Sequence, residues 1–400
     1  MKIIIGSQTW AWGPASKAEV IGNLLTSQYH FEVDFYGDSV SYEFCDRSKS
    51  FSKCICIEDE TDFSCVDFSS YDLVISVMNP YLAVHAYKSG KKVFWLDSMS
   101  WIWNWSAYSK IEKLYNQIIH RPISDIIAEL KSLPPYDCKI FGHICSEWMF
   151  IQGNYYHKDH VIKKSEYVSA IINTKHVAAT ERDTIMISLS GQLCPYMDIE
   201  KGVTYGNKVQ FWLEEILDYY KGSRILFVGN DKVIEHIDKR DGIIYQQLPH
   251  NDFLKELNRC KALFCPCGFT TVYEGAAYSV PMFFLPETHD GNAYEFLLIT
   301  RGASNEERES AFPNLLLDVY RKNIYDIEPA EVTMDALYNC YHKLETNKEF
   351  LAAYKDKARS FIARIEEDRQ LASRQLEIIN RTINVDNGIS YIIERILSML

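Results

Sequence analysis

The sequence contains no apolar run that approaches the ~20 residues a membrane-spanning helix needs. Its first residues, MKIIIGSQTWAWG, hold one lysine and three consecutive isoleucines before Gly6, too few for the apolar core of a secretory signal. The chain also shows no fixed-period repeat and no low-complexity tract. These absences predict a cytoplasmic protein without a transmembrane segment.

Positive charge and metal-ligand spacing are also lacking. Lys and Arg total 42 against 54 Asp and Glu, a net charge of −12, which argues against a nucleic-acid partner. The 11 cysteines have no paired metal-site spacing, and the C-x-C pairs Cys54/Cys56 and Cys265/Cys267 lie in strand-like runs where both side chains would face one buried side. No D-x-D pair occurs either. The sequence therefore predicts a reducing compartment and no required metal.

Short apolar runs do recur, separated by helical patterns, and this alternation is typical of parallel sheets covered on both faces. At 400 residues and 47% apolar content, the chain is long enough for two domains of roughly 150 to 200 residues each. We expect an α/β fold with two Rossmann-like domains, 1–175 and 176–380, joined in the polar stretch 153–183. Residues 381–400 form a last segment with an amphipathic helix.

The expected elements follow from these runs. Strands are predicted at 2–5, 31–35, 73–77, 93–96 and, less regularly, 139–144 in the first half, and at 184–188, 224–228, 242–245, 262–265 and 282–285 in the second. Helices are predicted at 15–25, 81–89, 209–220, 251–258 and 271–278.

Tryptophans gather after two of the predicted strands. Trp10 and Trp12 follow the first strand, and Trp101 and Trp103 follow the strand at 93–96. Ligands of doubly wound sheets bind outside the carboxyl ends of the strands, where indole rings can stack on a sugar or an aromatic acceptor. The four tryptophans are therefore candidate acceptor contacts. The alternative is that they pack the core beneath a loop.

Asp97 ends an apolar strand in the first half. A buried carboxylate with a raised pKa at that place can deprotonate an acceptor hydroxyl, which makes Asp97 the candidate base. An aspartate that caps a helix or a turn is the alternative.

The second half carries two candidate anion sites. Ser190 and Gly191 follow its opening strand, and Gly268, Thr270 and Thr271 lead from a strand into a helix whose N-terminal amides suit a diphosphate. Glu274 lies one turn further and can accept both hydroxyls of a ribose. An ordinary capping box is the alternative for the threonines and Glu274.

An ordered motif runs through residues 242–303. It comprises Tyr245-Gln-Gln-Leu-Pro-His250, then Cys267-Gly268 to Glu274, then Val280-Pro281 and Pro286, then His289-Asp290-Gly291-Asn292. This motif resembles the nucleotide-sugar domain of GT-B glycosyltransferases, in particular the lipid II-forming N-acetylglucosaminyltransferase and the UDP-glycosyltransferases.

The resemblance implies two domains that face a central cleft and a final helix, 389–400, that crosses back onto the N-terminal domain. It implies a role for each matching position: Gln247 and His250 at the base, Gly268, Thr270 and Thr271 at the diphosphate, Glu274 at the ribose, and Asp290 and Asn292 at the donor sugar. Asp97 lies near the family's acidic position in the acceptor half.

The sequence departs from the family at Gln8 to Trp12, which replace a histidine after the first strand, and at Gly291, which replaces a glutamine. Pro266 stands where retaining enzymes have a second glutamate, so the resemblance favours inversion. It implies an enzyme that moves a sugar from a nucleotide-sugar, a UDP-sugar by preference, to a hydroxyl or amine of a small molecule, with no cofactor beyond the donor. A nucleotide-sugar hydrolase or epimerase and a non-catalytic binding subunit remain the alternatives.

Overall fold

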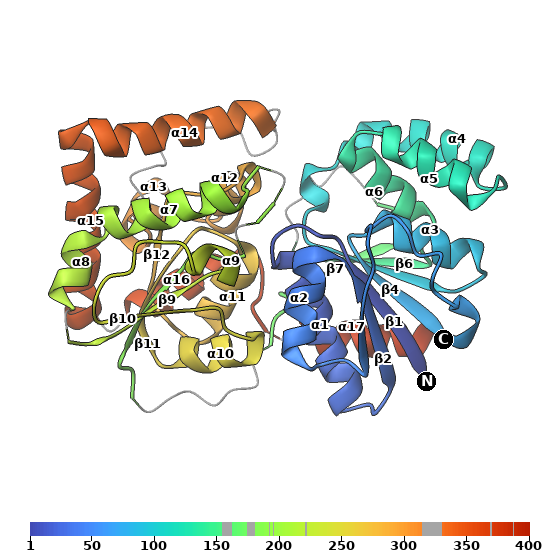
Figure 1. Cartoon of the computed structure of the whole chain (residues 1–400), viewed down its shortest axis with the longest axis horizontal. Coiled ribbons are helices and arrows are strands. Elements are labelled where there is room, and N and C mark those ends of the chain that lie inside the picture. The colour runs from blue at the N-terminus through green and yellow to red at the C-terminus, as the bar shows by residue number, and fades with distance from the viewer. Residues whose placement is uncertain are drawn as a thin grey trace. The chain divides into compact units, whose positions relative to one another are not determined.

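A computed structural model describes residues 1–153, 162–173, 181–191, 193–194, 196–220, 222–313, 330–368, 370–386 and 388–400. The chain forms two compact units (Figure 1). Unit 1 comprises Met1–Ile172 with Asn387–Leu400, and unit 2 comprises Asn173–Asp386. The boundary that the sequence placed after residue 175, and the parts 154–161 and 174–180 of the expected junction, lie outside the described residues.

Unit 1 is built on a parallel sheet in the order β3-β2-β1-β4-β5-β6-β7. Its strands are β1 (Lys2–Ser7), β2 (Glu32–Gly37), β3 (Lys53–Cys56), β4 (Leu73–Val77), β5 (Val93–Asp97), β6 (Trp148–Gln152) and β7 (Ser165–Val168). Its helices are α1 (Gly13–Ser27), α2 (Ser39–Ser48), α3 (Pro80–Lys88), α4 (Tyr108–Ile118), α5 (Ile123–Ser132), α6 (Pro135–Ile144) and α17 (Gly388–Met399), with short 3-10 turns at Phe68–Ser70, Ser100–Ile102 and Trp105–Ala107.

The central strands of unit 1 are apolar along their whole length because both faces of the sheet are covered. Side chains alternate between the faces of a strand. Accordingly Ile3 and Ile5 of β1 pack in one core cluster, with residues of α1 and α17, and Ile4 packs in another, with residues of α3 and α6. A strand buried on both faces reads as a continuous apolar run, which is why these strands were predicted correctly.

Unit 2 has a smaller parallel sheet in the order β10-β9-β8-β11-β12. Its strands are β8 (Thr184–Ser188), β9 (Arg224–Val228), β10 (Ile243–Gln246), β11 (Cys260–Cys265) and β12 (Met282–Phe284). Its helices are α7 (Ile199–Trp212), α8 (Glu214–Tyr219), α9 (Asp231–Ile234), α10 (His250–Asn258), α11 (Phe269–Ala277), α12 (Asp290–Ile299), α13 (Asn305–Ala311), α14 (Ala330–Thr346), α15 (Lys348–Glu367) and α16 (Leu371–Asn380).

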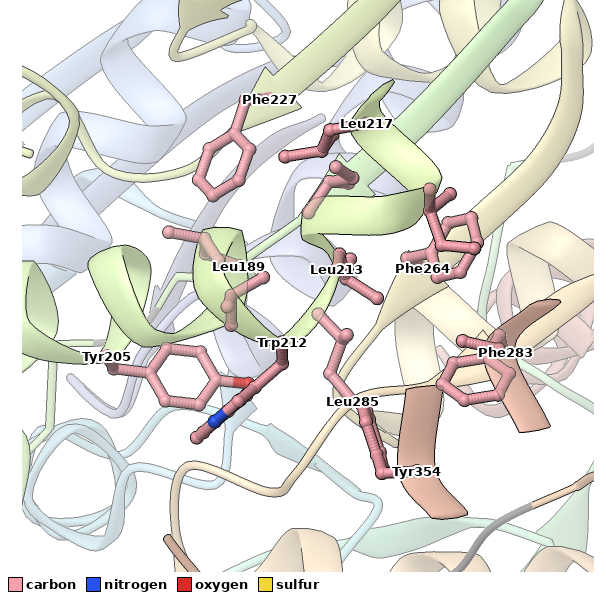
Figure 2. Close-up of a cluster of buried hydrophobic side chains, with 14 of the residues drawn as sticks. Leu189, Tyr205, Trp212, Leu213, Leu217, Phe227, Phe264, Phe283, Leu285 and Tyr354 are labelled. Atoms are coloured by element: carbon pink, nitrogen blue, oxygen red, sulfur yellow. The ribbon is translucent and has the colours of Figure 1, made fainter. Parts of the chain in front are cut away.

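The main core of unit 2 is rich in aromatic rings. Figure 2 shows the Trp212 side chain beside Tyr205 and Tyr354. The rings of Tyr205 and Trp212 meet edge to face with centroids 6.0 Å apart, one of the preferred arrangements of aromatic pairs. Part of the high aromatic content therefore stabilises the fold.

The strand predicted at 139–144 is wrong, because these residues form the second half of helix α6. Pro135 begins the helix, a place that proline favours. Cys138 to His143 are all buried, so the helix has no polar face to reveal its period. A short apolar run of this kind does not distinguish a buried helix from a buried strand. The next strand of the sheet is β6, and β7 lies within the stretch expected to join the domains.

Two further expectations concern cysteines and membranes. Cys265 and Cys267 are buried as predicted, whereas Cys54 is half-buried and Cys56 exposed, since β3 is the edge strand of its sheet. None of the helices that the structure describes is long and apolar enough to cross a membrane.

Helix α17 packs on the sheet of unit 1 beside α1 (Figure 1). Its isoleucines Ile389, Ile392, Ile393 and Ile396 enter the same core cluster as Ile3 and Ile5. The helix starts at Gly388, where an added Cβ would lie 2.4 Å from the Ser169 carbonyl oxygen. The start of α17 thus lies directly against the backbone that follows β7.

Gly388→Ala is therefore expected to lower the free energy of unfolding by about 1 to 3 kcal/mol, as overpacking does elsewhere. Urea unfolding measures this loss. Gly13→Ala is the matched control in the same unit, because no atom lies within 4 Å of its added Cβ. Equal stability of the two variants would contradict the packing described at Gly388.

Candidate functional site

The chain order of unit 2 reverses between β8 and β11. From β8 the chain adds β9 and β10 on one side, and it then returns to add β11 and β12 on the other. Ile187 of β8 pairs with Phe264 of β11, so the loops that leave these strands start side by side. Doubly wound sheets bind ligands at such a switch point.

Two of the predicted loops leave the sheet at this switch point. Ser190 and Gly191 follow β8, and Ser190 has a positive φ of 60°. Gly268 follows β11 and is the residue before helix α11. Thr270 and Thr271 lie half-buried in the first turn of that helix. Amides and hydroxyls at a helix N-terminus form an anion site.

Glu295 of α12 also lies at the α11 N-terminus. Its Oε2 accepts a hydrogen bond from the Phe269 amide at 2.8 Å, and the residue is 5% exposed. The first amide of the α11 N-terminus is therefore already bound to a carboxylate. An anion at this place would bind the amides and hydroxyls further along the first turn.

Glu274 and His250 form a buried pair. The His250 Nε2 and Glu274 Oε1 atoms are 2.7 Å apart, and the side chains are 4% and 2% exposed. His250 begins α10 after β10, and Glu274 lies in α11 after β11. The structure thus brings together two residues that the sequence assigned separately to the base and the ribose of one nucleotide.

Two of the residues predicted to contact the donor, Asn292 at the sugar and Gln247 at the base, are engaged with the protein. Asn292 Nδ2 donates to the Cys267 carbonyl at 3.1 Å, and its Oδ1 accepts from the Thr288 hydroxyl at 3.2 Å. Asn292 therefore fixes the start of α12 to the loop before α11. Asp290 begins α12, and burial raises the pKa of its carboxyl. Gln247 Oε1 accepts from the Asp231 amide at 2.8 Å.

Three buried polar groups follow strands of the same sheet, and the sequence analysis had assigned a role only to Ser190 among them. Ser190 Oγ, Asn230 Nδ2 and His289 Nδ1 are buried and have no hydrogen-bond partner among the described residues. They follow β8, β9 and β12. Burial lowers the pKa of His289 to about 4, so its imidazole is neutral at pH 7. Such groups are costly to leave unsatisfied, and a polar ligand at this edge would satisfy them. A survey of the polar residues in the loop after every strand would have found Asn230.

Asp97 is the last residue of β5 and is fully buried. Its Oδ1 accepts from the Met99 amide at 2.7 Å, and its Oδ2 accepts from Trp95 Nε1 at 3.1 Å. Burial raises the pKa of the carboxyl to about 6, and the charge of Lys139 partly offsets this effect. Burial thus acts on the Asp97 pKa in the expected direction, and both carboxylate oxygens are bound within residues 95–99.

The four tryptophans differ in exposure. Trp101 and Trp103 are buried, at 8% and 4%, whereas Trp10 and Trp12 are half-buried. Trp103 packs edge to face on Trp95 at 5.9 Å. Trp101 and Trp103 therefore contribute to packing. Trp10 and Trp12 keep some ring surface exposed.

No family model and no curated protein matches the chain. Among solved structures, it is similar to a spinosyn rhamnosyltransferase at 10% identity, with 100% of both chains aligned and a TM-score of 0.52. The same comparison gives a spinosyn rhamnosyltransferase complexed with thymidine diphosphate at 10% identity, 96% and 98% coverage and a TM-score of 0.49. It also gives UGT2 of Phytolacca americana, complexed with UDP-2-fluoro-glucose and pterostilbene, at 11% identity and a TM-score of 0.46. That alignment covers 90% of this chain and 99% of UGT2.

The match at a TM-score of 0.52 extends over the whole chain and both sheets. The chain has the GT-B fold. At 10% identity the match shows the fold and leaves the chemistry to the site. Within this GT-B fold, unit 2 carries the ordered motif of residues 245–292 around its switch point. Among the described residues, no three His, Cys, Asp or Glu side chains are grouped as a metal site.

Proposed function

We propose that this protein is an inverting glycosyltransferase. It binds a nucleotide-sugar, a UDP-sugar by resemblance, in unit 2 and transfers the sugar to a hydroxyl or amine of a small molecule that unit 1 binds. A solved structure with the same fold over its whole length is a rhamnosyltransferase, which supports sugar transfer in general.

The observation that carries the proposal is the arrangement around α11. The helix starts at the β8/β11 switch point, with Thr270 and Thr271 half-buried in its first turn, and the Glu274–His250 pair lies one turn further along it. A diphosphate on the first turn and a ribose near Glu274 fit the order of groups in a nucleoside diphosphate.

The chemistry follows from this placement. Transfer requires a diphosphate to leave with an additional negative charge. Fixed helix amides and hydroxyls stabilise developing charge without reorganisation, which lowers the barrier to departure. The Ser190–Gly191 side of the switch point offers backbone amides at the end of the other strand.

The first test is a thermal-shift panel of UDP, dTDP, GDP, ADP and CMP with their common sugar conjugates. We expect one nucleotide to raise the melting temperature by several degrees, since binding at 100 times Kd stabilises by about 2.7 kcal/mol. Thr270→Val with Thr271→Val should abolish the shift, because valine keeps the shape and removes the hydroxyls. The absence of a shift with every nucleotide would refute the proposal.

Glu295 offers a more specific test of the diphosphate position. Glu295→Gln keeps an oxygen that can accept from the Phe269 amide but removes a negative charge from the α11 N-terminus. We expect the nucleoside diphosphate to bind about fivefold more tightly, equivalent to roughly 1 kcal/mol, because two anions no longer share one helix end. Calorimetric titration measures this change. The matched nucleoside, which lacks phosphate, should bind the variant and the wild type equally.

A further inference from the structure

Unit 1 has a switch point of its own. From β1 the chain adds β2 and β3 on one side, and it then returns to add β4 and the later strands on the other. Gln8 follows β1, and its backbone N–H donates to the Val77 carbonyl of β4 at 2.9 Å. The loop that begins at Gln8 therefore lies over the place where a doubly wound sheet binds its ligand.

Glu60 comes to this switch point from the connection between β3 and β4. Its Oε2 accepts from the Thr9 amide at 3.0 Å, and its carbonyl accepts from the Asn79 side chain at 3.3 Å. The residue is half-buried. The other oxygen, Oε1, accepts no hydrogen bond from a described group, and it is not fully buried. One carboxylate oxygen of Glu60 is thus bound to the loop after β1, and the other is available to a ligand.

A buried lysine accompanies Glu60. Lys139 of α6 is 4% exposed, and its Nζ donates to Gln8 Oε1 at 2.7 Å. Its charge acts on both Asp97 and Glu60. Burial lowers the pKa of Lys139, and the neighbouring carboxylates oppose this effect. A buried ammonium is costly unless carboxylates compensate it, so Lys139, Asp97 and Glu60 form one charged group.

The two carboxylates of this group differ in access. Asp97 is fully buried, with both oxygens bound to Met99 and Trp95. Glu60 keeps an oxygen for a ligand. The pKa of the Glu60 carboxyl is raised, mainly by burial and also by the nearby Asp38 and Asp59. The hydrogen bond from the Thr9 amide and the charge of Lys139 partly offset this rise. A carboxylate with a raised pKa and a free oxygen suits proton abstraction near neutral pH.

We propose that Glu60 is the general base for the acceptor and that Lys139, held by Gln8, is its positioning residue. This inference rests on the proposed glycosyl transfer. The acceptor oxygen forms a bond to the anomeric carbon of the donor, and the bond from that carbon to the diphosphate oxygen breaks. The nucleoside diphosphate leaves with the electron pair, and the acceptor proton passes to Glu60 and then to water.

The test uses the full chain, the nucleotide-sugar selected by the thermal-shift panel, and 2-phenylethanol, whose hydroxyl stays protonated, as the acceptor probe. Chromatography measures release of the nucleoside diphosphate across pH 5 to 9. We expect Glu60→Gln to lower kcat at least about 100-fold with an unchanged thermal shift by the nucleotide. Glu58→Gln, an exposed glutamate of the same loop, is the matched control with wild-type turnover.

The positioning role predicts a change that a purely structural lysine would not cause. In Lys139→Met the Glu60 carboxyl loses a nearby positive charge, so its pKa rises and the acid limb of the kcat profile moves up by about one pH unit. The Glu60 and Glu58 variants decide the base assignment even where Lys139→Met does not fold. Turnover of Glu60→Gln at the wild-type rate would overturn this inference alone. Absence of nucleotide binding by the wild type would overturn the proposed function, and binding without release would count against both.

Discussion

Glu274→Gln is expected to weaken binding of the nucleoside diphosphate at least about tenfold, because a hydrogen bond to a charged group contributes roughly 1.5 to 3 kcal/mol. Glu274→Ala is expected in addition to lower the free energy of unfolding by about 1 to 3 kcal/mol, the usual cost of leaving a buried hydrogen-bonding group without its partner. The reason is that alanine removes the carboxylate 2.7 Å from His250 Nε2 in a place that excludes water.

Calorimetric titration and urea unfolding separate these two effects. Glutamine retains an oxygen for His250, so Glu274→Gln should lose affinity with little loss of stability. Glu377→Ala is the control for stability, since Glu377 pairs with Arg381 in the same unit but is 67% exposed, and such pairs contribute less than about 1 kcal/mol. Equal stability of Glu274→Ala and Glu377→Ala would show that the buried hydrogen bond contributes no more than an exposed ion pair.

Asp97 is expected to make the stability of the protein depend on pH in a direction opposite to that of most carboxylates. Burial raises its folded-state pKa to about 6, against a usual value of about 3.9 in an unfolded chain. Between these values the folded state binds the proton more tightly than the unfolded state. The unfolding free energy that Asp97 contributes therefore falls as pH rises from about 4 to 6, by roughly 3 kcal/mol in total.

Urea unfolding of the wild type and Asp97→Asn across pH 4 to 7 tests this prediction. The difference in unfolding free energy, variant minus wild type, should rise with pH by about that amount. An asparagine amide facing Trp95 Nε1 adds a cost that does not vary with pH. Asp62→Asn is the control, because hydrogen bonds from Ser64 lower the pKa of Asp62. Its contribution is complete above about pH 4.5, so that difference should stay flat. A flat difference for Asp97→Asn would show that its carboxyl is not desolvated.

The sequence predicted the sheets better than the helices between them. Runs such as Leu73–Val77 and Thr184–Ser188 are buried on both faces and agree with the observed strands to the residue. The same rule misassigned 139–144, since α6 is buried nearly all round and has no polar face. Edge strands such as β3 and β7 carry exposed residues and gave too weak an apolar signal.

The candidate site shows a similar division. The ordered motif between Gln247 and Asn292 located the strand ends of unit 2 and the start of α11. It did not reveal that Asn292 is engaged with the Cys267 carbonyl or that Glu295 accepts from the α11 N-terminus. A motif gives the order of residues along the chain, and the direction of each side chain depends on its neighbours in space.

By itself the sequence determined the α/β class, the parallel sheets and the strand ends at which ligands of such sheets bind, because apolar periodicity and strand-end loops are local properties of the chain. Tertiary structure decided which polar side chains are paired and which are accessible. Gln8 and Lys139 are 131 residues apart and His250 and Glu274 are 24 apart, yet each pair is joined by one hydrogen bond. Burial and pairing of this kind set the pKa of Asp97 and the access to Glu60, and they arise only when distant strands are brought to one edge of a sheet.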